Sequence, residues 1–362
     1  MPVLPRDEPC IRVEGVTYTA ADFTGGEMPD FASRSPYHRE LGEFLQDWFS
    51  ASPFLSVQTS GSTGAPKVLQ VEKERMRQSA RMTCAFLRLR PKDSALLCMP
   101  LRYIAAKMMV VRALVAGLDL YPVVPSGHPL RSISRPFHLA ALVPLQVFNS
   151  LQNEPERKRL SAIHVLLIGG GVIDPQVEVG LRSFPNAVYS TYGMTETLSH
   201  IALRRVNGTE ASPYYTPFDS VMLSLSEEGT LCIEAPLVHQ GRLVTHDIAE
   251  LLPDGRFRIL GRKDNVINSG GIKIQIEEME RLLAPLLPPP FAVTSLPDVR
   301  FGEIVVLVTE RPVADRLALE QALPPYHIPR KYVRVEKIPL TETGKISRSQ
   351  LKELVLRLSA SD

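Results

Sequence analysis

The feature that most constrains the fold is an alternation of short apolar runs with longer amphipathic segments between residues 37 and 191. Runs such as Ala95–Met99 and Ile163–Ile168 are almost wholly apolar, as buried parallel strands are. Intervening segments such as Glu72–Leu89 and Ile104–Ala116 carry apolar side chains at helical spacing. Strands that alternate with helices build a largely parallel α/β sheet, which we predict here. The same pattern predicts further elements at Tyr37–Phe49, Leu120–Val124 and Ala187–Thr191.

The pattern changes twice beyond Pro213. Polar and apolar residues first alternate between short turns, which predicts a smaller mixed sheet with strands at Val221–Leu225, Thr230–Glu234 and Arg256–Leu260. A polar break at Gly261–Asn265 then opens a last section of about 100 residues, enough for a small α+β domain. There we predict a helix at Ile276–Ala284, strands at Phe291–Ser295 and Ile304–Thr309, and a final helix opened by Ser347.

Composition and charge argue against several functions. The 41 basic and 39 acidic side chains leave a net charge of +2, which does not favour nucleic-acid binding. No apolar run is long enough to cross a membrane, since Lys107 and Arg112 interrupt the best candidate, Ile104–Leu118. Met1–Cys10 does not resemble a secretion signal, so we expect a cytoplasmic protein. The four cysteines are widely spaced, and we expect them to be reduced.

A loop suited to phosphate binding follows the apolar stretch Phe54–Val57. It contains hydroxyl groups, glycines and a final lysine, in the order Thr59, Ser60, Gly61, Ser62, Thr63, Gly64, Ala65, Pro66 and Lys67. Glycines let backbone N–H groups surround an anion, hydroxyl groups add donors, and lysine adds positive charge. The loop is not a Walker A motif, because Pro66 replaces the second glycine and no serine or threonine follows Lys67. We predict a nucleotide-phosphate site here.

Three further segments agree with this phosphate loop. They are Thr191–Glu196, Gly261–Asp264 and Pro339–Ile346. In this order, the four segments closely resemble the adenylate-forming superfamily of acyl-CoA synthetases, carrier-protein adenylation domains and luciferases. The resemblance runs from Thr59 to Lys345. It implies a large N-terminal α/β domain with a small mixed β subdomain, followed by a small mobile C-terminal α+β domain.

The resemblance also implies domain boundaries and roles for individual residues. Residues 1–262 would bind ATP and the acid, residues 263–264 with Asp264 would form a hinge, and residues 265–362 would form the C-terminal domain. Glu196 would bind Mg²⁺, a hard cation that one carboxylate and phosphate oxygens suit. Asp247 and Arg262 would hold the ribose hydroxyls, and Tyr192 would flank the adenine. The implied nucleotide-binding residues beyond the phosphate loop are Gly170, Gly171, Tyr192, Gly193, Thr195, Asp247 and Arg262. Taken alone, Gly169–Gly171 would equally suit a tight turn.

Lys345 is the expected catalytic lysine. When a carboxylate attacks the α-phosphate of ATP, two anions approach each other, so a cation between them stabilises the transition state. In the superfamily the C-terminal domain then rotates, and the thiol of CoA attacks the acyl adenylate. Gly270 and Gly271 match the glycine turn that approaches CoA in that pose. The resemblance therefore implies ATP, Mg²⁺ and CoA, with Lys345 and Glu196 in catalytic roles.

The stretch Pro100–Met109 bears on the acid substrate. It resembles the acyl-pocket motif of bacterial o-succinylbenzoate:CoA ligases, which act in menaquinone biosynthesis. That substrate has a second carboxylate, and Lys107 is a candidate counter-ion because an unpaired cation in an apolar helix is costly. Its long stem would equally let it reach the helix edge. Tyr103 stands where relatives often carry histidine.

Histidines and chain length raise further points. His246 replaces the glycine of the usual Thr-Gly-Asp, and we assign it no catalytic role; we interpret His164 and His200 as structural. Only 58 residues precede Thr59, fewer than relatives usually carry, so we expect a reduced N-terminal layer or one completed by oligomerisation. A homodimer is an expectation from the superfamily alone.

Other functions remain open at this point. The same chemistry would serve another aryl or fatty acid, or a carrier-protein phosphopantetheine in place of CoA. A non-catalytic nucleotide-binding relative is a further hypothesis. It is opposed by the joint presence of Lys67, Glu196, Asp247, Arg262 and Lys345.

Overall fold

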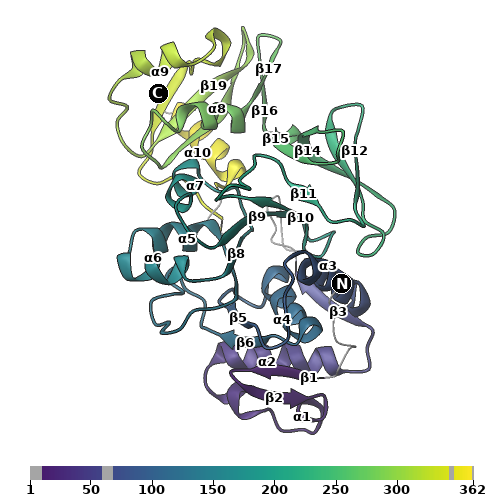
Figure 1. The fold of residues 1–362 in the computed structure, drawn as a ribbon. Helices are drawn as coiled ribbons and strands as arrows, with labels where there is room; N and C mark the ends of the chain where they lie inside the picture. Colours follow the sequence, from purple (N-terminus) through teal and green to yellow (C-terminus); the bar gives the residue numbers. More distant parts are fainter. Residues whose placement is uncertain (1–9, 59–67, 342–345, 361–362) are drawn as a thin grey trace. The chain divides into compact units, whose positions relative to one another are not determined.

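The computed structural model describes residues 10–58, 68–341 and 346–360 of the chain (Figure 1). The chain divides into two compact units, which we call unit 1 (residues 1–222 and 234–243) and unit 2 (residues 223–233 and 244–362). The phosphate loop, Thr59–Lys67, and the expected catalytic Lys345 lie outside the described residues. The hinge predicted at residues 263–264 falls within unit 2, and it stays a prediction.

Unit 1 is built on a nine-stranded sheet, counted over the described residues. Its strands are β1 (Cys10–Val13), β2 (Val16–Thr19), β5 (Ser94–Leu97), β6 (Asp119–Pro122), β7 (Leu139–Leu142), β8 (Val165–Ile168), β9 (Ala187–Gly193), β10 (His200–Arg205) and β11 (Thr216–Pro217). Their order is β11-β10-β9-β8-β7-β5-β6-β1-β2. The strands from β9 to β1 run parallel, and antiparallel pairs form the two ends. The predicted, largely parallel α/β sheet is confirmed.

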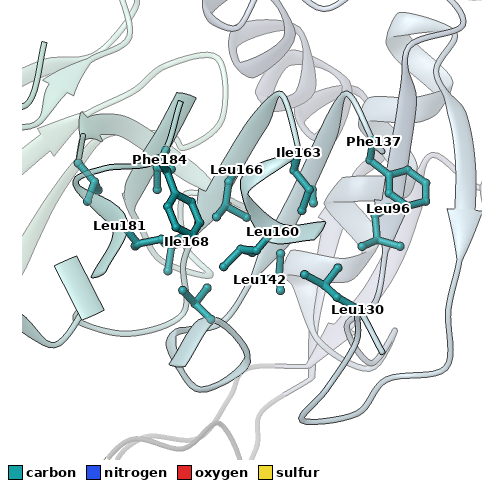
Figure 2. Close-up of a cluster of buried hydrophobic side chains, with 14 of the residues drawn as sticks. Leu96, Leu130, Phe137, Leu142, Leu160, Ile163, Leu166, Ile168, Leu181 and Phe184 are labelled. Carbon is teal, nitrogen blue, oxygen red and sulfur yellow. The ribbon is translucent and has the colours of Figure 1, made fainter. Parts of the chain in front are cut away.

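Helices of unit 1 enclose the core of this sheet. They are α1 (Ala21–Thr24), the 3₁₀ helix η1 (Asp30–Ser33), α2 (Pro36–Phe49), α3 (Lys73–Phe86), α4 (Ile104–Ala116), α5 (Pro144–Leu151), α6 (Glu154–Ser161) and α7 (Pro175–Leu181). Figure 2 shows Leu166 and Ile168 of β8 in one buried cluster with Leu160 of α6 and Leu181 of α7. Helix α4 has the predicted bounds, and it ends at Gly117 because the φ of 65° there favours glycine.

Residues 10–58, ahead of the phosphate loop, extend one end of the main sheet and add helix α2. β1 pairs with β2 as a hairpin and with β6 of the main sheet, and α2 buries Leu41 and Leu45. The Tyr37 hydroxyl donates a hydrogen bond to the Met99 carbonyl at 2.8 Å, which ties α2 to the main sheet region. Beyond α2, β3 (Phe54–Gln58) and β4 (Val68–Glu72) form an antiparallel pair on either side of the phosphate loop.

Among its described residues, unit 2 has one five-stranded sheet and most of a four-stranded sheet. Most of the four-stranded sheet β12-β13-β14-β15 lies in unit 2, and its strands are β12 (Met222–Leu225), β13 (Thr230–Glu234), β14 (Arg242–Leu251) and β15 (Phe257–Arg262). The five-stranded sheet contains β16 (Val266–Ser269), β17 (Ile272–Gln275), β18 (Phe291–Asp298), β19 (Gly302–Thr309) and β20 (Lys331–Arg334). Its order is β17-β16-β19-β18, and β20 pairs with β19. The 3₁₀ helix η2 (Lys263–Asn265) joins the two sheets.

Helices cover both faces of the five-stranded sheet. They are α8 (Ile276–Leu283), α9 (Arg316–Ala322), the 3₁₀ helix η3 (Pro325–His327) and α10 (Arg348–Ala360). Along β19, Val305 and Leu307 join a buried cluster with α8 and α9, whereas Val306 and Val308 join a second cluster with α10. The part of β19 that is buried on both faces, Val305–Val308, is apolar, which is why the sequence predicts a strand here. No described helix is long and apolar enough to span a membrane.

Candidate functional site

The glycine turn and the tyrosine expected to flank adenine lie at the carboxyl ends of neighbouring parallel strands. Gly169–Gly171 follow β8, and Tyr192 lies near the end of β9. A Cβ atom on Gly169 would lie 2.5 Å from Oγ1 of Thr191, so glycine lets the two strand ends approach this closely. Gly170 has a φ of 81°, which also favours glycine. Ligands of open parallel sheets bind at this edge.

The loop that carries Glu196 is a tight connection from β9 to β10. A Cβ atom on Gly193 would lie 2.3 Å from the carbonyl oxygen of Ser199, so no larger residue fits there without a backbone shift. Inside the loop, Oγ1 of Thr197 accepts a hydrogen bond from the N–H of Met194 at 3.1 Å and donates to the Ser199 carbonyl at 2.8 Å. The positions of Gly193 and of this loop are therefore fixed by backbone contacts.

Glu196 and Thr195 lie on this loop. The Glu196 side chain is exposed, and its carboxylate forms no ion pair with any residue in the described ranges. The Thr195 carbonyl accepts a hydrogen bond from the N–H of Leu198 at 2.9 Å, which closes a turn around Glu196. Within the described residues, no group of three or more His, Cys, Asp or Glu side chains is placed to hold a metal. A lone carboxylate fits Mg²⁺ that takes its remaining ligands from phosphate groups and water.

A buried cation contacts the end of the same loop. Arg112 of α4 is only 2% exposed, and its Nη2 donates a hydrogen bond to Oγ of Ser199 at 2.6 Å. Its Nε has no hydrogen-bond partner, and no carboxylate within the described part of the chain pairs with it. Burial lowers the pKa of Arg112 to about 10, so the group is still charged at neutral pH. A buried charge without a counter-charge is costly.

Sequence reasoning missed Arg112 as a site residue. The interruption of an apolar run by Arg112 served only to argue against a membrane span. A single arginine on a helix that buries most of its residues was the available signal, since charged residues are rarely fully buried without a partner.

His200 lies beside this cation. Its Nε2 forms a 2.9 Å hydrogen bond with Oγ1 of Thr83 in α3. Burial, followed by the nearby charge of Arg112, lowers the pKa of His200 well below its usual 6.5. The imidazole is therefore neutral at physiological pH, which agrees with the structural role that we expected for it.

Lys107 has partners of its own one turn earlier in α4. Its Nζ donates a hydrogen bond to the Ser56 carbonyl at 2.8 Å and lies 5.8 Å from the centre of the Phe44 ring. Burial lowers the pKa of the Lys107 ammonium group. The structure thus joins Lys107 to β3, directly ahead of the phosphate loop, and its role as a substrate counter-ion stays a prediction.

Unit 2 brings the two expected ribose-binding residues together. Asp247 lies opposite Arg262 in the β14–β15 ladder, and Nη1 of Arg262 donates to Oδ1 of Asp247 at 3.1 Å. The Asp247 residue is buried, and its backbone N–H is held by the Thr245 hydroxyl at 3.1 Å. A fixed carboxylate beside a forked cation suits recognition of a diol.

The expected hinge residue forms its own contacts next to this pair. Oδ2 of Asp264 lies 2.7 Å from Nδ1 of His246 and 3.4 Å from Nη2 of Arg262. Hydrogen bonding from His246 makes the largest contribution to a lowered pKa of the Asp264 carboxyl. The histidine that replaces glycine in this chain therefore contacts the hinge position, a contact that sequence reasoning did not predict.

Gly270 and Gly271 form the two-residue turn between β16 and β17. Their φ angles are 60° and 82°, and Ser269 pairs with Ile272 across the turn. Two positive φ angles in a two-residue hairpin loop are typical of glycine-rich tight turns. The backbone N–H of Gly270 donates a hydrogen bond to the Phe301 carbonyl at 2.8 Å, which ties the turn to the connection between β18 and β19.

Comparison with known proteins shows which family and which enzymes this chain resembles. Residues 36–244 match the model of the family described as AMP-binding enzyme. A 2-succinylbenzoate–CoA ligase of Listeria monocytogenes is 25% identical over 355 residues, which cover 89% of this chain and 74% of that protein.

The solved structures that are similar in fold include the following two. An acyl-CoA synthetase (AMP-forming)/AMP-acid ligase II-like protein of Dyadobacter fermentans has a TM-score of 0.62 and 30% identity, covering 88% of this chain and 95% of that one. The o-succinylbenzoate coenzyme A synthetase of Bacillus subtilis, solved with ATP and magnesium ion, has a TM-score of 0.66 and 22% identity, covering 82% of this chain and 69% of that one.

The fold is therefore that of the adenylate-forming enzymes. The chain belongs to the AMP-binding enzyme family. The predicted fold class and superfamily are confirmed, and the predicted enzyme class, an AMP-forming acyl-CoA ligase, is confirmed at the level of the family. The individual roles expected for the site residues stay predictions.

Proposed function

We propose that this protein activates o-succinylbenzoate with ATP to an enzyme-bound acyl adenylate and transfers the acyl group to CoA, as a step of menaquinone biosynthesis. The family membership supports the AMP-forming chemistry, and the names of the relatives support the acid. The observation that carries the choice of acid is Arg112, a buried cation that no described carboxylate neutralises.

The argument from Arg112 rests on the free energy of burial. A fully buried guanidinium group is costly unless an anion or several acceptors compensate it. Its one described side-chain acceptor is the Ser199 hydroxyl, in the loop that also carries Glu196. A substrate that reacts through one carboxylate and retains a second would supply the missing anion. A monocarboxylic aryl or fatty acid would bring no second carboxylate, and the described residues supply no counter-charge for Arg112, so we favour the dicarboxylic acid.

Within unit 1, the remaining roles follow from side-chain chemistry. Tyr192 and the turn at Gly170 and Gly171 would flank the adenine ring. Glu196 would hold Mg²⁺, which neutralises phosphate charge when it is bound. The phosphate loop, which ends at Lys67, would bind the β- and γ-phosphates.

Within unit 2, Asp247 would accept hydrogen bonds from the ribose hydroxyls while Arg262 holds it in place. Lys345 would lie between the attacking carboxylate and the α-phosphate and stabilise the charge that develops on the leaving pyrophosphate. The turn at Gly270 and Gly271 would approach CoA in the second half-reaction.

Mass-spectrometric product analysis tests this proposal. The protein is incubated with ATP, Mg²⁺ and o-succinylbenzoate, with and without CoA, and AMP is followed in parallel. We expect o-succinylbenzoyl-CoA together with AMP only in the complete mixture. A thioester formed with benzoate or a fatty acid but not with o-succinylbenzoate would overturn the choice of acid. No AMP with any acid would overturn the enzymatic role.

Measuring the two half-reactions separately tests the role of Lys345. Lys345→Ala should abolish adenylate formation, because the charge between the two reacting anions is lost, and should largely spare thioester formation from supplied acyl adenylate. Lys337→Ala is the matched control, since Lys337 is an exposed lysine of the same unit. Equal loss of both half-reactions in Lys345→Ala would contradict the role assigned to this lysine.

A further inference from the structure

A second tyrosine packs against Tyr192 from a distant part of unit 1. Tyr215 directly precedes β11, the edge strand that pairs with β10. Its ring centre lies 5.9 Å from that of Tyr192, at an interplanar angle of 58°. Tilted aromatic pairs at this separation attract each other, so the position of one ring restrains the other.

Tyr215 is itself held by the strand that carries Tyr192. Its hydroxyl lies 2.8 Å from Oγ of Ser190, two residues before Tyr192 on β9. Ser190 and Tyr192 project from the same face of the strand, because side chains alternate along it. The Tyr215 side chain therefore spans this face from the buried Ser190 to the ring of Tyr192.

A charged pair restrains Tyr215 on its other side. The guanidinium group of Arg204 in β10 lies 5.6 Å from the Tyr215 ring centre, and Arg204 also bonds the Ser212 carbonyl at 3.4 Å. Glu178 of α7 forms an ion pair with Arg204. Burial lowers the pKa of Arg204, but hydrogen bonding and charge from Glu178, followed by those from Tyr215, outweigh it and raise the pKa. β9 and β10 thus both contact Tyr215, and Glu178 of α7 holds the Arg204 side chain that lies over its ring.

We infer that Tyr215 is a positioning residue for the nucleotide: it fixes the ring of Tyr192, and thereby the adenine that Tyr192 flanks. The inference rests on the proposed function, in which Tyr192 contacts adenine. Neither the motif of residues 191–196 nor the glycine turn at 169–171 contains Tyr215, which comes from the otherwise irregular segment ahead of β11.

Calorimetric titration of the full chain with ATP and Mg²⁺, without an acid, tests the inference. Replacing Tyr215 by leucine removes the ring, and the Kd for ATP should rise roughly three- to tenfold, the range expected for one aromatic contact. Tyr215→Phe keeps the ring and loses only the hydroxyl, so it should recover most of the affinity. In turnover, Tyr215→Leu should raise KM for ATP while KM for the acid stays unchanged.

Tyr189→Leu is the matched control. Tyr189 lies on β9, as Tyr192 does, but its ring contacts Phe86 and Arg205. It should leave the Kd for ATP unchanged, even where it lowers the melting temperature. Wild-type protein that binds no ATP would refute the proposed function. Wild-type protein that binds ATP, with unchanged Kd in Tyr215→Leu or with equal rises in Tyr215→Leu and Tyr189→Leu, would overturn the inference alone.

Discussion

The surroundings of the Glu196 loop in unit 1 and the end of the β14–β15 pair around Arg262 in unit 2 differ in how deeply their charged groups are buried and in how those groups are paired. In unit 1, Arg112 and His200 are buried, and Nε of Arg112 has no partner among the described residues. In unit 2, the side chains of Arg262, Asp264 and His246 are 46%, 47% and 59% exposed, and each is paired with a neighbour. A buried charge destabilises the fold unless other groups pair with it, whereas an exposed ion pair contributes little to stability.

The two regions also differ in how much room surrounds a glycine in each. A Cβ atom on Gly193 would meet the backbone of Ser199, which cannot move without moving the strand. A Cβ atom on Gly261 would meet the side chain of Gln275, at 2.2 Å from its Nε2, and that side chain can rotate away. We therefore expect the unit 1 region to resist rearrangement and the unit 2 region to rearrange at a lower free-energy cost.

The largest difference is expected from alanine at these two glycines. Gly193→Ala forces a backbone shift between β9 and β10, and we expect a loss of about 3 kcal/mol in the stability of unit 1. Gly261→Ala displaces Gln275 and its two 2.8 Å hydrogen bonds, to the Arg262 carbonyl and to Oε2 of Glu277, so unit 2 should lose about 1–2 kcal/mol. Hydrogen exchange followed by mass spectrometry reports the two units separately. Equal losses in both variants would refute the contrast in rigidity.

His200 provides a pH-dependent test of the buried region. Its folded-state pKa is lowered below the unfolded value near 6.5, so below that pH the unfolded chain binds more protons. Unit 1 should therefore lose stability as the pH falls from about 6.5, and His200 alone should contribute at most about 1.4 kcal/mol per pH unit to that loss. Urea unfolding followed by fluorescence of Trp48, the chain's single tryptophan and a residue of unit 1, measures this.

The matched variant is His200→Gln. It removes the titrating group, so the slope of stability between pH 6.5 and pH 5 should flatten, even where the variant is less stable overall. An unchanged slope would mean that other groups carry the pH dependence and that His200 is not held neutral by its surroundings.

The smallest effect is expected at the exposed pair in unit 2. His246→Gly restores the residue usual for the superfamily and removes the contact to Asp264 at 2.7 Å. Because both side chains are half exposed, unit 2 should change in stability by about 0.5 kcal/mol or less. Hydrogen exchange at residues 260–275 measures it. A loss above about 2 kcal/mol would show that this pair is a structural anchor, contrary to the adjustable region described above.

The fold was accessible from the sequence where local patterns and tertiary environment agree. β8 is buried and apolar throughout, β19 is buried on both faces from Val305 to Val308, and α4 ends at a glycine that its backbone requires. β14 was missed because five of its ten residues are arginine, threonine, histidine or acids, and its pairing with β15 sets its conformation. Short helices such as α5 and α7 were missed because their stability comes mainly from packing on the sheet.

The site was accessible only where it follows sequence motifs. The glycine turn, Tyr192 and Glu196 belong to segments with a recognisable order. Arg112 and Tyr215 do not, because their importance comes from burial and from contacts 87 and 25 residues away along the chain. No sequence window contains both partners of such a contact. The contact of His246 with Asp264 escaped prediction for the same reason.

The most direct test of the central claim compares the two cations of α4. The ratio of kcat/KM for o-succinylbenzoate to kcat/KM for benzoate is measured in wild-type protein, in Arg112→Gln and in Lys107→Gln. We expect the ratio to fall roughly 30-fold or more in Arg112→Gln, because a buried carboxylate loses its counter-charge. It should change much less in Lys107→Gln, whose lysine is already bonded to the Ser56 carbonyl. An unchanged ratio in Arg112→Gln would contradict the account, because Arg112 would then be a structural cation without a role in substrate recognition.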